Sequence, residues 1–127
     1  MNVVDSSGWL EYLADGPNAG AFARPIESTA TLIVPTLSLY EVFKRVRQQR
    51  DEDEALRAIA VMEQGRVIDL DRATALEAAR LSLLHGIALA DAVMLATAQR
   101  HAAMLWTQDS EFDGLPGAKY IPKKNAP

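Results

Sequence analysis

The run from Leu89 to Ala98 constrains the fold more than any other stretch, because it reads as a helix that is apolar nearly all the way round. Only Asp91 and Thr97 interrupt it. A helix without a polar face belongs inside a protein. An ionised carboxylate there is costly unless it is paired, hydrogen-bonded or bound to a metal ion. Asp91 is therefore the strongest single candidate for a functional residue.

Short apolar runs predict the strands of a sheet. They lie at residues 2–4, 29–34, 67–70 and 104–107, with a weaker edge strand at 119–121. Asp5 directly follows the first run, and Asp109 follows the fourth. Ligands of an open parallel α/β sheet bind at the carboxyl ends of its strands. Asp5 and Asp109 are therefore candidates for a binding site at that edge.

Helical patterns fill the segments between these strands. They cover residues 6–14, 19–27, 37–50, 52–64, 72–86 and 89–98. In the helix after Asp71, the spacing of Leu76, Ala79 and Leu83 predicts the buried face. Strands that alternate with helices predict an α/β fold with a mostly parallel sheet of four to five strands, covered by helices on both faces.

Length and composition narrow the class of protein. The 127 residues predict one domain over residues 1–127, with residues 122–127 as a flexible tail. The chain has no cysteine and only two histidines, so carboxylates are expected to hold any metal ion, which favours Mg²⁺ or Mn²⁺. A net charge of −4 argues against a protein that coats nucleic acid with its whole surface. With no transmembrane run and no signal peptide, we expect a cytoplasmic protein that does not contact a membrane.

Each acid also has a structural explanation. The structural alternative for Asp5 is a helix N-cap, and for Asp109 it is the start of a turn. For a helical residue such as Glu41, the alternative is a side chain that simply faces solvent. The joint pattern is stronger, since Asp5, Asp91 and Asp109 fall at the same predicted edge of the sheet. Carboxylates gathered there repel one another unless a divalent cation neutralises them.

Four motifs in this order resemble the PIN-domain family. They are Asp5-Ser6-Ser7, Glu41 within Leu39-Tyr40-Glu41-Val42, Asp91 within Leu89-Ala90-Asp91-Ala92, and Thr107-Gln108-Asp109-Ser110-Glu111-Phe112 followed by Leu115-Pro116-Gly117. The length and the short C-terminal tail resemble the VapC-type ribonuclease toxins of type II toxin–antitoxin systems within that family. The resemblance covers essentially the whole chain.

The resemblance implies a PIN-like, Rossmann-like three-layer fold and an endoribonuclease that depends on Mg²⁺ or Mn²⁺. It also implies a homodimer that cleaves RNA with metal-activated water and is inhibited by a VapB-type antitoxin. The implied metal-binding and catalytic residues are Asp5, Glu41, Asp91 and Asp109, supported by the hydroxyls of Ser6 and Thr107. Asp113 has no firm match and stays outside this set.

A basic run follows Glu41, where many relatives have small or apolar residues and a glycine. Its residues Lys44, Arg45 and Arg47 are candidate contacts for RNA or for an antitoxin. A solvated helix face, balanced by the acids that follow at 51–54, is the slightly favoured alternative.

Two other functions compete with a nuclease. A phospho-receiver signalling domain has a similar length and element order, but it expects paired acids after the first strand and a phospho-accepting Asp after the third. Here Asp5 is followed by two serines, and Asp69 is predicted inside its strand. The other alternative is a catalytically silent PIN domain that only binds a partner, against which the four acids argue.

Overall fold

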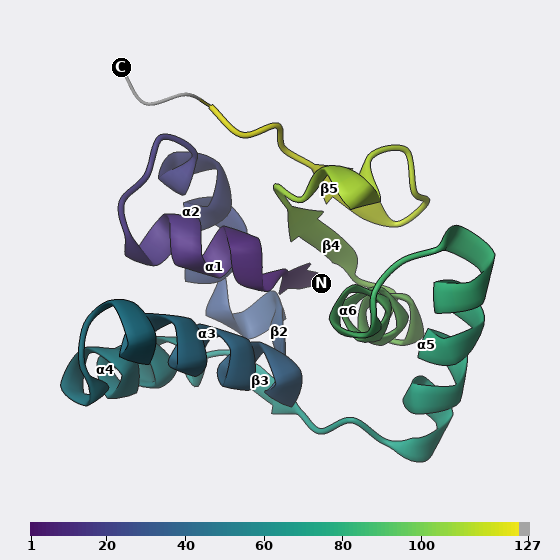
Figure 1. Ribbon diagram of the computed structural model, residues 1–127, viewed down its shortest axis with the longest axis horizontal. Coiled ribbons are helices and arrows are strands. Elements are labelled where there is room, and N and C mark those ends of the chain that lie inside the picture. Colours follow the sequence, from purple (N-terminus) through teal and green to yellow (C-terminus); the bar gives the residue numbers. More distant parts are fainter. Residues whose placement is uncertain (125–127) are drawn as a thin grey trace.

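Five parallel strands form one sheet in the order β3-β2-β1-β4-β5 (Figure 1). The computed structural model describes residues 1–124. The strands are β1 (Asn2–Val4), β2 (Leu32–Pro35), β3 (Arg66–Ile68), β4 (Met104–Thr107) and β5 (Ala118–Tyr120). The strand order reverses at β1 and β4, and sheets of this kind bind ligands beside such a switch point. The predicted parallel α/β fold is confirmed.

Helices cover both faces of the sheet (Figure 1). One face carries α1 (Ser6–Leu13), α2 (Ala19–Glu27), α3 (Thr36–Gln49) and α4 (Glu52–Met62), and the other carries α5 (Arg72–His85) and α6 (Leu89–Arg100). Successive side chains of a strand point to opposite faces. Val4 accordingly joins the core of the first helix group, and Val3 joins the core around α6.

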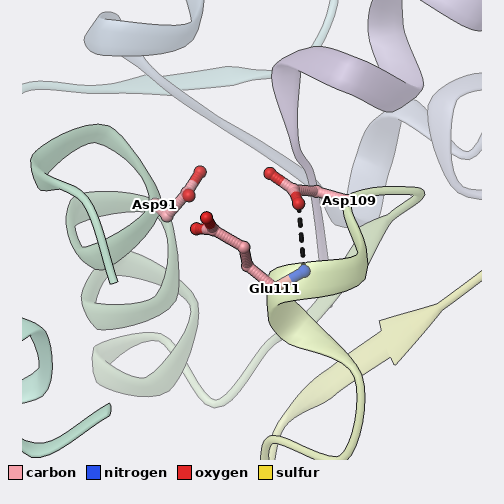
Figure 2. A group of neighbouring side chains, drawn as sticks. All are labelled: Asp91, Asp109 and Glu111. Atoms are coloured by element: carbon pink, nitrogen blue, oxygen red, sulfur yellow. Dashed lines mark hydrogen bonds between the residues drawn. The ribbon is translucent and has the colours of Figure 1, made fainter. Parts of the chain in front are cut away.

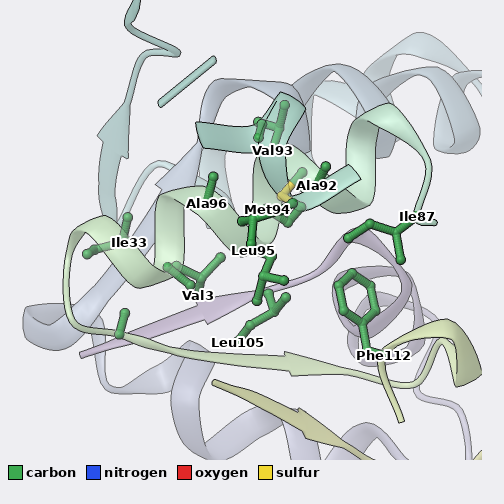
Figure 3. Packing of buried hydrophobic residues seen from close by; sticks show 14 residues of the cluster. Val3, Ile33, Ile87, Ala92, Val93, Met94, Leu95, Ala96, Leu105 and Phe112 are labelled. Carbon is green, nitrogen blue, oxygen red and sulfur yellow. The ribbon is translucent and has the colours of Figure 1, made fainter. Parts of the chain in front are cut away.

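The helix α6 is the centre of its core, as the sequence predicts. Every residue from 92 to 98 is buried, and the helix packs on Val3, Ile33 and Leu105 of the sheet (Figure 3). Among residues 1–124, no single helix is long and apolar enough to cross a membrane. Only α5 and α6 together reach that length and composition, as a pair bent by 117°.

The predicted inner face of α5 is wrong. Leu76 and Leu83 are 46% and 88% exposed, whereas the buried residues of this helix are Thr74, Ala78 and Leu81. The helix packs mainly on α6 rather than on the sheet. Small side chains such as Thr74 and Ala78 let the two helices approach closely, so the leucine spacing misidentifies the buried side. The helix ends at Gly86 in the left-handed conformation (φ 65°), as expected for a helix C-cap.

Two strand boundaries also differ from the prediction. Thr29–Thr31 form a 3-10 turn, η1, and β2 begins at Leu32. All three η1 residues are exposed, so this part of the predicted strand does not pack on the core. The third strand ends at Ile68, so Asp69 follows β3 instead of lying inside it.

The C-terminal segment is partly fixed at its start. Asn18 Nδ2 donates a hydrogen bond of 2.9 Å to the carbonyl of Pro122. Residues 122–124 have no regular secondary structure. The rest of the predicted flexible tail, residues 125–127, lies outside the described residues.

Candidate metal centre

Three of the predicted acids lie around the switch point of the sheet. Asp5 directly follows β1, and Asp109 comes two residues after β4. Asp91 lies in the first turn of α6, where the helix dipole favours a negative charge. Glu41 is added from the middle of α3, 35 residues along the chain from its hydrogen-bond partner Ser6.

Asp5 and Glu41 form what we call the floor of the site, and Asp5 is the more buried of the two. Its side chain is almost fully buried, with the residue only 4% exposed. The Ser7 hydroxyl donates to Asp5 Oδ2 at 2.9 Å, and the Thr107 hydroxyl donates to the same oxygen at 3.0 Å. Burial raises the pKa of Asp5; these hydroxyls oppose the shift, and the charge of Asp109 adds to it. The two hydroxyls thus fix one carboxylate oxygen in place.

Glu41 lies beside Asp5 and is held in a similar way. The Ser6 hydroxyl donates to Glu41 Oε1 at 2.6 Å. Partial burial raises the pKa of Glu41, the Ser6 hydrogen bond lowers it, and the charge of Asp5 raises it further. Ser6 therefore contacts Glu41, while Ser7 supports Asp5.

Asp91, Asp109 and Glu111 form the rim of the site. One carboxylate oxygen from each lies within 4.8 Å of the other two, and the three side chains converge from α6 and from the 3-10 turn η2 (Ser110–Phe112) (Figure 2). Asp109 Oδ1 accepts a hydrogen bond of 3.0 Å from the Glu111 backbone N–H.

The rim carries the largest shift in the site. Burial raises the pKa of Asp91 to about 7, together with the charges of Asp5 and Asp109 and with the hydrogen bond and charge of Glu111. Because Asp5 affects both Glu41 and Asp91, the floor and the rim form one electrostatic unit. The structure therefore brings together all four acids that the sequence singles out.

Sequence reasoning missed Glu111 and Ser7. Glu111 stands only two residues after Asp109, and η2 turns the chain so that both side chains reach Asp91. Ser7 stands two residues after Asp5, close enough along the chain for its hydroxyl to donate to the Asp5 carboxylate. The short spacing of acids and hydroxyls was the available signal in both cases.

The remaining candidates lie outside this cluster. Asp113 is exposed at the end of η2 and does not belong to the converging group. The basic run divides along α3: Arg45 lines a cleft shared with α1, whereas Lys44 and Arg47 line an apolar groove between α3 and α4.

The donor set fits a hard divalent cation. Its core is the three rim carboxylates, whose oxygens lie within 4.8 Å of one another, and Asp5 and Glu41 lie next to them. None of these five acids forms an ion pair with a Lys, Arg or His among residues 1–124. Oxygen-only ligand sets suit Mg²⁺ and Mn²⁺. A cation bound there would offset both the burial and the like charges that raise the pKa of Asp91.

Comparison with known proteins supports the fold. The family model described as "PIN domain" matches residues 3–118. No curated protein matches the chain significantly.

Several solved structures share the fold. A toxin–antitoxin complex from Klebsiella pneumoniae aligns with a TM-score of 0.77 and 21% identity, covering 95% of this chain and 100% of that one. VapC20 of Mycobacterium tuberculosis, a toxin that cleaves the sarcin–ricin loop, aligns at 0.74 and 17%, covering 91% and 95%. DNA-bound VapBC from Salmonella typhimurium aligns at 0.74 and 13%, covering 96% and 98%. At these identities the likeness concerns the fold, and the match of the family model over most of the sequence shows that the chain belongs to the PIN domain family.

Proposed function

We propose that this chain is a cytoplasmic endoribonuclease that depends on Mg²⁺ or Mn²⁺ and is the toxin of a VapBC-type pair. The observation that carries the proposal is the convergence of Asp91, Asp109 and Glu111 oxygens within 4.8 Å, beside the buried Asp5. No cation from the chain offsets these charges among the described residues. The fold neighbours include a toxin that cleaves the sarcin–ricin loop and several toxin–antitoxin complexes.

Each acid has a proposed role. Asp5, Glu41, Asp91 and Asp109 are the metal ligands and catalytic residues, and we add Glu111 to the rim. Ser6, Ser7 and Thr107 position the floor carboxylates through the hydrogen bonds described above. When bound, the cation would lower the pKa of an attacking water and offset charge on the phosphate.

The reaction is hydrolysis of an RNA phosphodiester. Water attacks phosphorus and the 3′ oxygen leaves, which gives 5′-phosphate and 3′-hydroxyl products without a covalent enzyme intermediate. The fixed hydroxyls keep Asp5 and Glu41 oriented in advance, so less reorganisation is needed when substrate binds.

We further propose a homodimer and a VapB-type antitoxin as partners. The toxin–antitoxin complexes among the fold neighbours support the antitoxin as a partner, and the resemblance to VapC-type toxins is the basis for the homodimer. Lys44, Arg45 and Arg47 are the proposed contacts for RNA or antitoxin. In VapBC-type pairs the antitoxin is encoded beside the toxin, so the product of the neighbouring gene is the candidate partner. Light scattering of the purified chain, alone and with that product, measures both associations.

The sheet order disfavours the phospho-receiver alternative. Receiver-type sheets follow the order 2-1-3-4-5, whereas the order here is β3-β2-β1-β4-β5. Asp69, although it follows its strand, therefore ends an edge strand rather than a central one.

The deciding experiment is cleavage of a mixed pool of structured RNAs by the purified chain in Mg²⁺ or Mn²⁺. Discrete products that disappear with EDTA and with Asp91→Asn are expected. Asp113→Asn is the matched control, because this acid lies outside the cluster. Cleavage that survives Asp91→Asn would contradict the assigned site, and binding of the antitoxin without any cleavage would favour the silent PIN domain.

A further inference from the structure

A cleft of about 1000 Å³ runs between α1 and the pair α3–α4. Figure 1 shows α1 beside these two helices. Ser7, in the first turn of α1, and Gln108 are among the residues that line the cleft. Ser7 also donates to Asp5, and its hydroxyl accepts the Gln108 backbone N–H at 3.3 Å. The cleft therefore begins at the wall of the acidic site and leads away from it along α1.

The cleft offers positive charge that the chain itself does not use. Arg45, Arg50 and Lys123 line it, and none forms an ion pair with another residue in the described range 1–124. Arg57 and three acids also line the cleft, so its lining has a net charge of +1. Glu11 accepts the Asn18 N–H at 2.6 Å, Asp51 caps α4 through the Glu54 N–H, and Glu54 pairs with Arg57 at 2.7 Å.

The floor between these charges is partly apolar. It contains Leu10 and Leu13 of α1, Val46 of α3 and Val61 of α4, all partly buried. From Ser7 to Ala14 the lined edge of α1 spans about 10 Å at 1.5 Å per residue. That length matches about three stacked nucleotides at 3.4 Å each. Grooves that bind single strands combine such cationic edges with a surface for the base faces.

The apolar groove between α3 and α4 differs from this cleft. It encloses about 600 Å³ and is lined by Leu39, Tyr40, Phe43, Leu56 and Ile59 with the basic residues Lys44 and Arg47. Neither the acids of the site nor the hydroxyls that hold them line it. A polyanion bound there would not be guided to the carboxylates. The α1 side is the one that connects cations with the acids.

We propose that the cleft between α1 and α3–α4 holds a single-stranded segment of the RNA on one side of the scissile phosphate. The inference rests on the proposed ribonuclease function and assigns the path of its substrate. Arg45, Arg50 and Lys123 neutralise backbone phosphates, and the aliphatic floor contacts the bases. Of the three basic residues after Glu41, Arg45 lines this cleft and is proposed to contact the RNA. Lys44 and Arg47 line the other groove and lie outside the proposed substrate path.

Charge reversal tests the proposal. The variant Arg45→Glu/Arg50→Glu is compared with Arg24→Glu/Arg72→Glu, which changes the charge equally at exposed positions that do not line the cleft. Binding of a fluorescent single-stranded RNA decamer is measured by polarisation against salt, without divalent cations. We expect the cleft variant to bind at least about 10-fold more weakly, with a salt slope smaller by about 1.4, or 0.7 for each lost phosphate contact. Equal effects of the two variants, or no RNA binding by the wild type, would overturn the proposal.

The absence of cysteine from the sequence permits a second, positional test. Gln49→Cys in the cleft and Ala79→Cys, exposed on α5, each carry one photoreactive maleimide. Cross-linking of the RNA is expected at Gln49→Cys alone. Equal cross-linking at both positions, or cross-linking at Ala79→Cys alone, contradicts the assigned path.

Kinetics separate this proposal from the proposed function. The cleft variant is expected to raise KM with little change in kcat, whereas Asp91→Asn abolishes turnover. Cleavage with an unchanged KM in the cleft variant would refute the path and leave the nuclease standing. Cross-linking in the cleft without cleavage of any RNA pool would support the RNA path and contradict the proposed nuclease activity. If the cleft variant keeps RNA binding but escapes antitoxin inhibition, the cleft belongs to the antitoxin and the proposal fails.

Discussion

The floor and the rim of the acidic site are built differently. On the floor, Asp5 and Glu41 accept hydrogen bonds from side-chain hydroxyls at 2.6–3.0 Å. On the rim, Asp91 and Asp109 accept no side-chain hydroxyl, and Asp109 accepts only the Glu111 backbone N–H among the described hydrogen bonds. The hydroxyls thus hold the floor carboxylates in place, whereas the rim lacks such support, so a bound cation would stabilise the rim more than the floor.

The pKa of Asp91 reflects this difference in hydrogen bonding between the floor and the rim. The hydroxyls around Asp5 counteract its burial, but nothing comparable opposes the burial and like charges that raise the pKa of Asp91 to about 7. A carboxylate that is so easily protonated gains most when a cation replaces the proton. We therefore expect substitutions on the rim to affect metal binding, and substitutions that disturb the floor to affect folding as well.

The largest effect is expected for Asp91→Asn. The amide cannot supply the negative charge that a divalent cation requires, so activity should fall more than the roughly 10–100-fold that loss of an outer-shell partner costs. Metal at 100 times its Kd should stabilise the wild type by about 2.7 kcal/mol, and this gain should largely vanish in the variant. RNA cleavage rates and urea unfolding with and without Mn²⁺ measure both effects. An undiminished gain in stability would show that the rim does not bind the metal.

A smaller loss of activity, with a loss of stability, is expected for Thr107→Val. Its hydroxyl donates to Asp5 and accepts the Asp109 N–H at 3.0 Å, so it joins floor to rim. Leaving buried groups unpaired costs about 1–3 kcal/mol, and disturbing an outer-shell partner costs roughly 10–100-fold in activity. Initial rates and urea unfolding provide the measurements.

Thr97→Val is the matched control for this change. Thr97 is also buried, but its hydroxyl bonds the Val93 carbonyl within α6, away from the acids. It should lose stability while keeping its rate of cleavage. If both variants lose activity equally, Thr107 acts through the fold and not through the site.

The sequence predicts the floor and the rim unequally. Asp5 and Asp109 could be placed at one edge because each follows a strand, and strands in a parallel sheet end together. Asp91 stood out because it interrupts an apolar helix. The bond from Ser6 to Glu41 spans 35 residues and depends on how α1 packs on α3, which no local pattern contains. Glu111 depends on η2, whose tight turn gives no hydrophobic period to detect.

The same limit explains the error in α5. Hydrophobic spacing favoured the face of Leu76 and Leu83, but helix–helix contact here selects small residues such as Ala78. Periodicity predicts where a helix lies and is less informative when the helix packs on another helix instead of the sheet.

A still smaller effect is expected for Glu111→Gln. Glu111 is exposed, whereas Asp91 is partly buried, so solvent screens the charge of Glu111 more strongly and its attraction for a cation is weaker. Metal affinity should fall by less than the roughly 10-fold at the lower end of outer-shell effects. Calorimetric titration with Mn²⁺ measures it, with Asp113→Asn as the control. A loss of affinity as large as that of Asp91→Asn would mean that Glu111 is a principal metal ligand. No loss would mean that Glu111 does not bind the metal and only raises the pKa of Asp91.

The last prediction concerns the pH dependence of stability in the metal-free protein. Because the folded-state pKa of Asp91 is about 7, against 3.8 for the unconstrained side chain, the folded protein binds more protons than the unfolded chain between these values. The free energy of unfolding should therefore fall as pH rises from about 4 to about 7, and this contribution should level off above that. Asp5 and Glu41, whose pKa values are also raised, act in the same direction. Asp71, whose pKa is lowered by the Thr74 hydrogen bonds, acts in the opposite direction but below pH 3.8.

Urea unfolding in EDTA between pH 5 and pH 8 isolates the rim in this comparison. Asp91→Asn should flatten the pH dependence, because the amide does not titrate, and only the contribution of the floor acids should remain. Mn²⁺ should also flatten it for the wild type near neutral pH, since a bound cation holds Asp91 ionised in the folded state. A wild type whose stability rises from pH 5 to pH 7 in EDTA would mean that burial and like charges do not raise the pKa of Asp91, and the contrast between floor and rim would then lose its electrostatic basis.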